Sequence, residues 1–420
     1  MTISLEAVAL TRFFIALLTL LFSSHLFGYL FIRWGMPRVV GEIFGGIILG
    51  PTLLGYLFPT IFEKLFLEQG ELLAVIYWLG LVLLMFTSGF EIERKFDKKD
   101  KKTIIALVIG TTLIPLIFGW IAIYFFDLDK LIGTAGNTLA LKLVITAALA
   151  MTSIPVLSKI FLDLGIMQTT FAKISLATAT IHDIILWIFI SVAAGLVSGE
   201  TVSVSNISVH VIISVLFFIV ALVIMPKIIA LIDRKKINII PQNNQATAFI
   251  VLVLLAFTAL ASVLDINLVF GAFLAGIVIN FIKNPKYDEV KNHIKDFSMA
   301  FLVPVYFGIV GIKLDLIRHL DIIFVIIFII FAIIVQTIAV IVTSKYFLKY
   351  NWLSSFNLAV ALNDRGGPCI VLATLAFELG IINENFFVTL VLLAIITSLT
   401  AGLWLRYVQS KGLPLLDEKE

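Results

Sequence analysis

Long apolar stretches separated by short polar connections make up almost the whole chain. A helix that crosses the hydrocarbon core of a bilayer needs about 20 largely apolar residues. Cutting the chain at charge clusters and turn residues gives thirteen such stretches. They run approximately over residues 11–32, 38–55, 71–91, 103–125, 139–161, 171–197, 207–232, 246–264, 268–282, 297–313, 320–344, 353–378 and 385–408. The pattern predicts an all-α polytopic membrane protein with about thirteen transmembrane helices.

The composition excludes a soluble protein, because 61% of the 420 residues are hydrophobic, 14% are charged, and the mean hydropathy is +1.12. A formal net charge of +3 gives no reason to expect a nucleic-acid partner. The single cysteine, Cys369, excludes an internal disulfide, and the five histidines lack zinc-binding spacing. No phosphate-binding loop, dinucleotide fingerprint or serine-hydrolase elbow occurs. We therefore expect a lipid bilayer as the surroundings, no cofactor and no nucleic-acid partner.

Basic residues alternate from one connection to the next. One set of alternate connections, which includes Lys227, carries 23 Lys and Arg residues, whereas the other set, which includes Arg318, carries six. Because Lys and Arg accumulate in cytoplasmic loops, this split predicts an outside N-terminus and a cytoplasmic C-terminus in a plasma (inner) membrane. The first stretch has neither a basic flank nor a small-residue cleavage pattern, so we expect it to be retained.

No stretch is long enough to form a soluble domain. The longest polar connections, 91–102 and 283–296, have the size of ordinary loops, and 409–420 is a short cytoplasmic tail. Any regulatory nucleotide-binding domain would have to belong to a separate subunit, whose existence is left open.

Three sequence matches indicate an internal repeat. Each match joins a stretch to the one seven places later, and an odd offset reverses the direction of crossing. The matched segments are 41–47 with 271–277, 89–93 with 311–315, and 152–155 with 364–368. They predict two inverted halves, stretches 1–6 and 8–13, joined by stretch 7.

Asp183 lies roughly a dozen residues from either end of the sixth stretch, near the middle of the membrane. An ionisable group costs several kcal/mol at that depth unless it is paired or hydrated, so a functional role is favoured over a helix clamp. A carboxylate provides a hard oxygen and full charge for Na⁺, K⁺ or Li⁺, and it exchanges that cation for a proton. We therefore expect Asp183 to be the metal ligand.

His182 precedes Asp183, and neighbours on a helix point about 100° apart. It is either a second proton carrier or a neutral packing residue, and both alternatives stay open. We expect packing without a specific partner for the remaining histidines, which are His25, His210, His293 and His319.

Two stretches carry helix breakers at corresponding positions. Pro155 interrupts the fifth stretch, and Gly366, Gly367 and Pro368 interrupt the twelfth. Half-helices at membrane depth offer positive N-terminal ends to anions, and negative C-terminal ends and free carbonyls to cations. The pair of breaks predicts a binding site.

Arg365 stays charged inside the twelfth stretch and needs compensation. We expect it to neutralise the negative half-helix ends or to hold a carboxylate, with Asp364 as its adjacent counter-charge; the alternative is that both residues form a solvated loop pair. Glu42 and Glu91 fall near predicted cytoplasmic ends, where solvated or mouth-lining roles are favoured.

These residues resemble the monovalent cation:proton antiporters, specifically the second branch of that superfamily. The similarity runs from about residue 37 to 403 and is carried by 86–91, 151–156, the Asp183 helix, 273–276 and 365–367. It implies that Asp183 is the ion-binding aspartate, that Thr152 and Ser153 lie in an unwound segment, and that Arg365 is the basic residue of the second broken helix.

The resemblance also implies a homodimer whose core moves as an elevator. Stretches 1–3 and 8–10 (1–100 and 246–318) would form the dimerisation domain, and stretches 4–6 and 11–13 (101–200 and 319–408) the core, with 201–245 as a linker helix. One departure matters: electrogenic members carry two adjacent aspartates where this chain has His182 and Asp183, and usually lysine in place of Arg365. One titrating carboxylate predicts electroneutral exchange of one proton for one Na⁺ or K⁺.

Competing functions remain at this point. The same fold would serve an exporter of organic anions or metabolic products, or a passive ion channel. A membrane-embedded enzyme is disfavoured because no nucleophile, base and oxyanion arrangement is found.

Overall fold

The computed structural model describes residues 7–90, 100–198, 212–213, 216–234, 245–264, 266–282 and 285–417. Within these ranges the chain is helical apart from connections and one isolated antiparallel bridge between Ile132 and Ile382. The predicted all-α class is confirmed. Glu91 and His210 lie outside the described residues, as does part of the seventh predicted stretch.

The helices closely follow the predicted stretches. Their bounds are α1 Ala7–Arg33, α2 Arg38–Leu49, α3 Leu54–Leu57, α4 Pro59–Phe62, η1 Glu63–Leu67, α5 Gly70–Phe90, α6 Lys101–Ala122, η2 Leu128–Lys130, α7 Thr138–Ala150, α8 Ile154–Asp163, α9 Thr170–Ser198, η3 Val220–Ile224, α11 Met225–Arg234, α12 Gln245–Val263, α13 Leu268–Asn280, α14 Pro285–Phe297, η4 Ser298–Leu302, α15 Val303–Ile312, α16 Ile322–Ile341, η5 Val342–Phe347, α17 Trp352–Leu362, α18 Gly366–Glu378 and α19 Glu384–Ser410.

Nine helices of the described chain are long and apolar enough to cross a membrane. Four shorter apolar helices accompany them: α7, α13, α17 and α18. The fifth and twelfth predicted stretches are each divided, into α7 and α8 and into α17 and α18. The chain is therefore an integral membrane protein, while the total of thirteen crossings stays a prediction.

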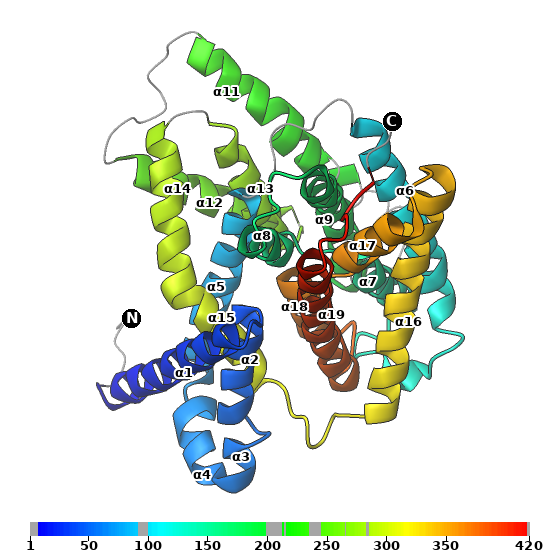
Figure 1. Cartoon of the computed structure of the whole chain (residues 1–420). Coiled ribbons are helices and arrows are strands. Elements are labelled where there is room, and N and C mark those ends of the chain that lie inside the picture. The colour runs from blue at the N-terminus through cyan, green and yellow to red at the C-terminus, as the bar shows by residue number, and fades with distance from the viewer. Residues whose placement is uncertain are drawn as a thin grey trace.

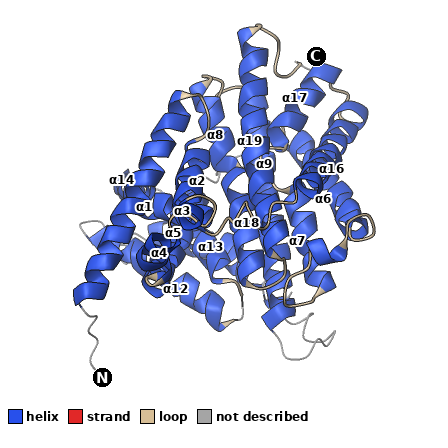
Figure 2. Ribbon diagram, turned by 90° about the horizontal axis from the view of Figure 1, so that it is seen from below, coloured by secondary structure: helices blue, strands red, loops and turns tan. Residues whose placement is uncertain are grey.

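The helices form two groups that lie side by side (Figures 1 and 2). One group contains α1, α2, α5, α12, α13 and α15, and the other contains α6, α7, α9 and α16 to α19. Helix α8 packs against α9 and α18 of the second group. The extensive helix contacts fall within a group, so the two groups contact each other less extensively than the helices inside each group.

Two glycine contacts in the first group are equivalent under the predicted repeat. A Cβ added to Gly311 of α15 would meet Ile43 O, Gly46 Cα and Ile47 N of α2. A Cβ added to Gly89 of α5 would meet Phe273 O, Gly276 Cα and Ile277 N of α13. In the predicted repeat α2 corresponds to α13, and α15 corresponds to α5. A contact between α2 and α15 therefore requires an equivalent contact between α13 and α5. The two contacts therefore support an inverted repeat.

We expect Gly276→Ala to destabilise the protein. The new Cβ would lie 2.1 Å from the carbonyl oxygen of Phe86, so the α5 and α13 backbones would have to separate. Overpacking of this kind costs about 1–3 kcal/mol. The thermal unfolding midpoint of purified protein measures the loss. Gly70→Ala is the matched control, because nothing lies within 4 Å of its added Cβ; equal midpoints for the two variants would contradict the close α5–α13 contact.

The surface of α16 is suited to lipid. Ile323, Ile327, Ile330 and Ile334 recur at helical spacing and are all exposed. Water would disfavour so continuous an apolar strip, whereas lipid tails cover it.

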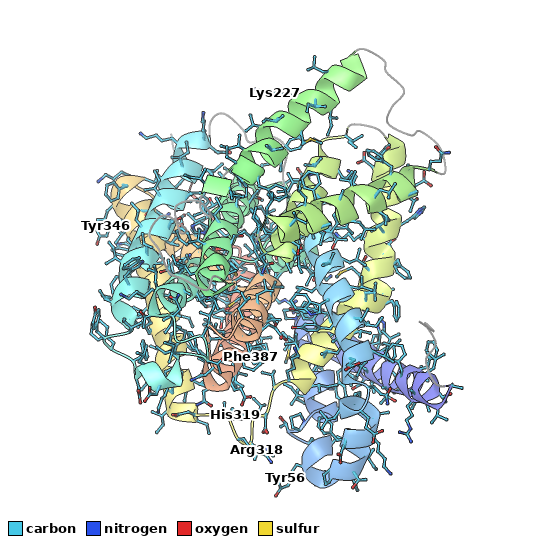
Figure 3. All side chains as sticks on the ribbon, turned by 180° about the vertical axis from the view of Figure 1, so that it is seen from behind. Tyr56, Lys227, Arg318, His319, Tyr346 and Phe387 are labelled. Atoms are coloured by element: carbon cyan, nitrogen blue, oxygen red, sulfur yellow. The ribbon has the colours of Figure 1, made fainter. Side chains whose placement is uncertain are left out.

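Polar connections close the two ends of the molecule. Lys227 of α11 lies at one end, and Tyr56, Arg318 and His319 lie at the other (Figure 3). This placement agrees with the predicted alternation of basic and less basic connections.

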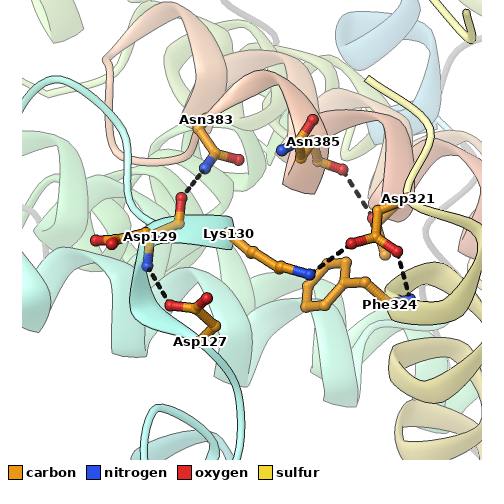
Figure 4. A network of polar contacts seen from close by, with 8 residues as sticks. Asp127, Asp129, Lys130, Asp321, Phe324, Asn383 and Asn385 are labelled. Atoms are coloured by element: carbon orange, nitrogen blue, oxygen red, sulfur yellow. Dashed lines mark hydrogen bonds and ion pairs between the residues drawn. The ribbon is translucent and has the colours of Figure 1, made fainter. Parts of the chain in front are cut away.

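At the Arg318 end, the α6–α7 connection is tied to α16 and α19 (Figure 4). Lys130 Nζ lies 2.5 Å from Asp321 Oδ2, and Asn383 Nδ2 donates to Asp129 O at 2.7 Å. The Lys130 hydrogen bond lowers the pKa of Asp321. Because a lowered carboxyl pKa stabilises the folded state above it, this tie persists at neutral pH and is lost as pH falls through the lowered pKa.

Candidate ion site

The two interrupted spans cross and contact each other at their breaks. Helix α7 ends at Ala150 and α8 starts at Ile154, while α17 ends at Leu362 and α18 starts at Gly366. Ser153 N donates to Asp364 O at 2.5 Å, and Thr152 Oγ1 donates to Leu362 O at 2.8 Å. Backbone groups that a continuous helix would satisfy are therefore satisfied by the other interrupted span.

The prolines start the second half-helices. Pro155 is in the first turn of α8, and Pro368 is the third residue of α18. A proline is tolerated there because the N–H groups of a first turn have no partner within the helix. The unwound residues are 151–153 and 363–365, so each break ends two or three residues before its proline, and Gly366 and Gly367 already belong to α18. The side chain of Pro155 lies outside the described part of the chain.

Gly366 is required by both its conformation and its surroundings. Its φ is +40°, and an added Cβ would lie 2.5 Å from Ser153 Oγ. A larger residue would strain the backbone and separate the two breaks. Gly367 is less restricted, since its added Cβ would meet Phe307 Cζ at 3.8 Å.

Arg365 is fully buried and bonded to backbone carbonyls of three helical segments. Its Nε donates to Ala148 O at 2.8 Å, and its Nη2 donates to Leu149 O at 2.9 Å and to Ala332 O at 3.0 Å. Its Nη1 donates to Asn363 O at 3.0 Å and Asn363 Oδ1 at 2.9 Å. The guanidinium therefore compensates the negative C-terminal end of α7, one of the two roles predicted for it.

Asp364 is also fully buried, so it is not part of a solvated loop pair. Its Oδ1 accepts a hydrogen bond from Ser398 Oγ at 2.6 Å, and its Oδ2 has no hydrogen-bond partner among the described residues. The Arg365 donors in the described chain all go to other oxygens. No hydrogen bond joins Asp364 to Arg365 among the described residues, because backbone carbonyls and Asn363 already satisfy the guanidinium; the role of Asp364 as the adjacent counter-charge stays a prediction.

Asp183 lies on α9, which packs against α7, α8, α17 and α18. Its side chain lies outside the described residues. Position 183 shares a helix face with Thr180 and Trp187. The Trp187 ring contacts Phe273 of α13 at 6.2 Å between ring centroids. This face of α9 is thus directed at the interface between the two helix groups.

His182 points to a different neighbour. Its Nε2 lies 2.8 Å from Thr111 Oγ1 on α6, and Thr111 Oγ1 also donates to Leu107 O. Because the threonine proton is used on Leu107, His182 Nε2 is the donor to Thr111 Oγ1. Its Nδ1 has no partner in the described chain. The arrangement favours the packing alternative for His182.

A narrow crevice enters the interface between the groups. It lies between the start of α2 and the helices α8, α18 and α19. Its lining residues are Pro37, Val39, Val40, Val156, Gly366, Ile370, Ala394, Ile395 and Ser398. The crevice reaches the crossing through Gly366 and Ser398.

Comparison with known proteins assigns the family. Residues 16–411 match the sequence profile described as "Sodium/hydrogen exchanger, transmembrane". The chain belongs to this family. It is therefore a transporter of the monovalent cation:proton antiporter superfamily and not an enzyme, as predicted.

Named relatives of this exchanger cover nearly its whole length. The Na⁺/H⁺ antiporter of Enterococcus hirae is 25% identical over 95% of this chain and 98% of the relative. The Na⁺/H⁺-K⁺ antiporter GerN of Bacillus cereus is 25% identical over 94% and 96%, respectively. The solved structure of the sodium proton antiporter MjNhaP1 from Methanocaldococcus jannaschii has a TM-score of 0.67 at 15% identity and covers 96% of this chain and 97% of that one. The structural similarity shows that this chain and MjNhaP1 share a fold.

Sequence analysis missed several polar residues of the exchanger's crossing. Gln336 Nε2 donates to Ala150 O at 3.4 Å and Leu362 O at 3.3 Å, which joins the ends of α7 and α17. Ser398 binds Asp364, and Arg365 N donates to Thr397 Oγ1 at 3.4 Å. Each is a polar residue within a strongly apolar stretch, and that isolation is the sequence feature that could have identified it.

Two expectations about ionisable residues of the exchanger are wrong. His25 has partners, because its Nε2 lies 2.8 Å from Ala300 O and its Nδ1 lies 2.8 Å from Arg38 Nη2. Arg38 also pairs with Glu42 at 2.7 Å, and Glu42 is buried, so the solvated alternative for it is wrong and the mouth-lining alternative stays a prediction. Ala300 of η4 is 275 residues from His25, whereas Arg38 lies on α2, the next helix after α1. His319 likewise pairs with Glu384 at 2.6 Å.

Proposed function

We propose that this exchanger is a secondary active antiporter that exchanges Na⁺ or K⁺ for H⁺ at Asp183. The observation that carries the proposal is the crossing of two interrupted spans against α9, the helix that bears Asp183. The names of two relatives agree with it: a Na⁺/H⁺ antiporter in Enterococcus hirae and a K⁺/H⁺ antiporter in Saccharomyces cerevisiae, the latter 26% identical over 93% of this chain and 45% of that protein.

The chemistry follows from what the crossing offers a dehydrated cation. Asp183 supplies the exchangeable charge, and Thr152 and Ser153 supply hydroxyl and backbone oxygens in the unwound segment. Protonation of Asp183 removes the charge that holds the cation, so the two substrates compete for one carboxylate. His182 is directed at α6 and is not required to carry a proton in this scheme.

Exchange at one carboxylate moves no net charge. Asp183 carries either one proton or one monovalent cation across the membrane, while Arg365 keeps its charge in both states. We therefore propose electroneutral one-for-one exchange.

Alternating access is proposed to occur by an elevator movement. The separation of the helices into two groups supports a core of α6 to α9 and α16 to α19 that slides along the rest. The remaining helices would form the dimerisation domain of a homodimer. The 23 to six division of basic residues supports a cytoplasmic C-terminus and an outside N-terminus in the plasma (inner) membrane. The antiporter would require no cofactor.

Reconstituted vesicles test the function. We expect an external pulse of Na⁺ or K⁺ to dissipate an imposed pH gradient, with Li⁺ compared in parallel and a pH-sensitive dye as the readout. An imposed membrane potential should leave the rate unchanged. Cation conduction without coupled proton movement would identify a channel, and gradient dissipation only with an added organic anion would identify the alternative exporter; either result overturns the proposal.

A further inference from the structure

Asp364 is a buried carboxylate that has no role in an exchange mechanism that uses Asp183 alone. It lies between the unwound end of α17 and the start of α18 and has no exposed surface. One oxygen accepts from Ser398 Oγ at 2.6 Å. The other, Oδ2, is buried without a partner in the described chain. A buried carboxylate oxygen without a donor is costly, so its retention calls for a transient partner.

At the crossing, the positive and the negative side chain lie at helix ends of opposite polarity. Arg365 binds carbonyl oxygens at the C-terminal end of α7. Asp364 lies where two helices begin, since it precedes α18 and its backbone oxygen accepts from Ser153 N at the start of α8. Helix N-termini favour negative charge, which offsets part of the cost of burying an ionised carboxylate at this location. Asp364 Oδ2 has no hydrogen-bond partner in the described chain, so this oxygen remains available to a ligand.

The charge of Arg365 favours a second carboxylate near the proposed site. A fixed guanidinium beside the site repels an incoming cation, and the carbonyl dipoles around it offset that charge only in part. Asp364 is adjacent in the chain and contributes a full negative charge. With Asp364 ionised, its negative charge balances the positive charge of Arg365. The negative charge of Asp183 then balances the bound cation, or is neutralised by a proton.

We propose that Asp364 is a second carboxylate ligand of the transported Na⁺ or K⁺, oriented by Ser398 and ionised throughout the cycle. The inference rests on the proposed function and assigns Asp183 the exchanged proton. The narrow crevice supports it, because Gly366 and Ser398, which flank Asp364 along the chain and through a hydrogen bond, both line that crevice.

Cation dependence of exchange tests the role of Asp364. We expect Asp364→Asn to raise the half-saturating concentration of Na⁺ or K⁺ by about tenfold or more, because the site keeps the Arg365 charge without its compensation. Exchange should stay electroneutral. Ser398→Ala should produce a smaller rise, since the carboxylate is kept but its orientation is lost. Asp163→Asn, a half-exposed aspartate at the end of α8, is the matched control and should leave the concentration unchanged.

Direct cation binding separates this inference from the proposed function. Calorimetry of detergent-purified protein with NaCl or KCl should show weaker binding to Asp364→Asn than to the unmodified protein, whether or not vesicles exchange protons. Unchanged binding and half-saturation in Asp364→Asn would overturn the second ligand while leaving exchange at Asp183 intact. Transport by the unmodified protein that responds to membrane potential, and loses that response in Asp364→Asn, would show that Asp364 itself titrates and would also overturn the inference.

Discussion

Asp183→Asn is expected to lower cation-dependent proton movement by ~100-fold or more, because an amide at this position neither releases a proton nor balances a bound cation. Asparagine has nearly the volume of aspartate, so the packing of α9 against α7, α8, α17 and α18 should persist. The measurement is the initial rate at which Na⁺ or K⁺ collapses a pH gradient in proteoliposomes. A companion experiment with isotopic cation flux should show the same loss.

The control for Asp183→Asn is Asp163→Asn, which removes a carboxylate paired with Lys159 on the surface of α8. Its rate should match that of the unmodified protein. Equal elution on size exclusion and an unchanged unfolding midpoint would establish that Asp183→Asn is folded. Undiminished exchange in a folded Asp183→Asn protein would contradict the assignment of the transport carboxylate and, with it, the proposed function.

Arg365→Leu is expected to have the largest effect on stability. Leucine fills part of the guanidinium volume but leaves the carbonyls of Ala148, Leu149 and Ala332 without this donor in a buried region. Breaking a buried charged network by removing one member costs about 3–5 kcal/mol. The thermal unfolding midpoint should fall sharply, and exchange should be lost because the α7 end is no longer held against α18.

Arg365→Lys distinguishes charge from geometry. Lysine keeps the charge but replaces a planar fork of donors with a single ammonium, so it should recover part of the stability and part of the exchange. Arg318→Leu is the matched control: its side chain is 80% exposed and lies 3.7 Å from Asp315, and its removal should leave the midpoint unchanged. A midpoint for Arg365→Leu equal to that of Arg318→Leu would contradict the structural role assigned to the buried guanidinium.

The contrast between Arg365 and Asp364 shows how neighbouring charges acquire different roles. In sequence they form an adjacent pair of opposite sign. In the structure the guanidinium binds the end of one half-helix, and the carboxylate lies at the beginning of others. Their separation by helix polarity keeps the carboxylate available for a cation, which a direct ion pair would prevent.

The sequence by itself determined the features that depend on local composition. Apolar length predicted the positions of the membrane helices, and glycines and prolines located the two interruptions to within a few residues. The motifs of the fifth, sixth and twelfth stretches together indicated the family. These inferences succeeded because a helix in lipid must satisfy its backbone within a single continuous segment, so every departure leaves a mark in the sequence.

Only the tertiary structure decided which groups meet across the chain. It directed His182 toward Thr111, joined His25 to Arg38 and Ala300, and left one oxygen of Asp364 without a partner in the described residues. Such contacts depend on how helices far apart in sequence cross and rotate against one another. Hydropathy in an almost uniformly apolar chain carries little information about that rotation, because lipid-facing and buried positions are filled by the same residue types.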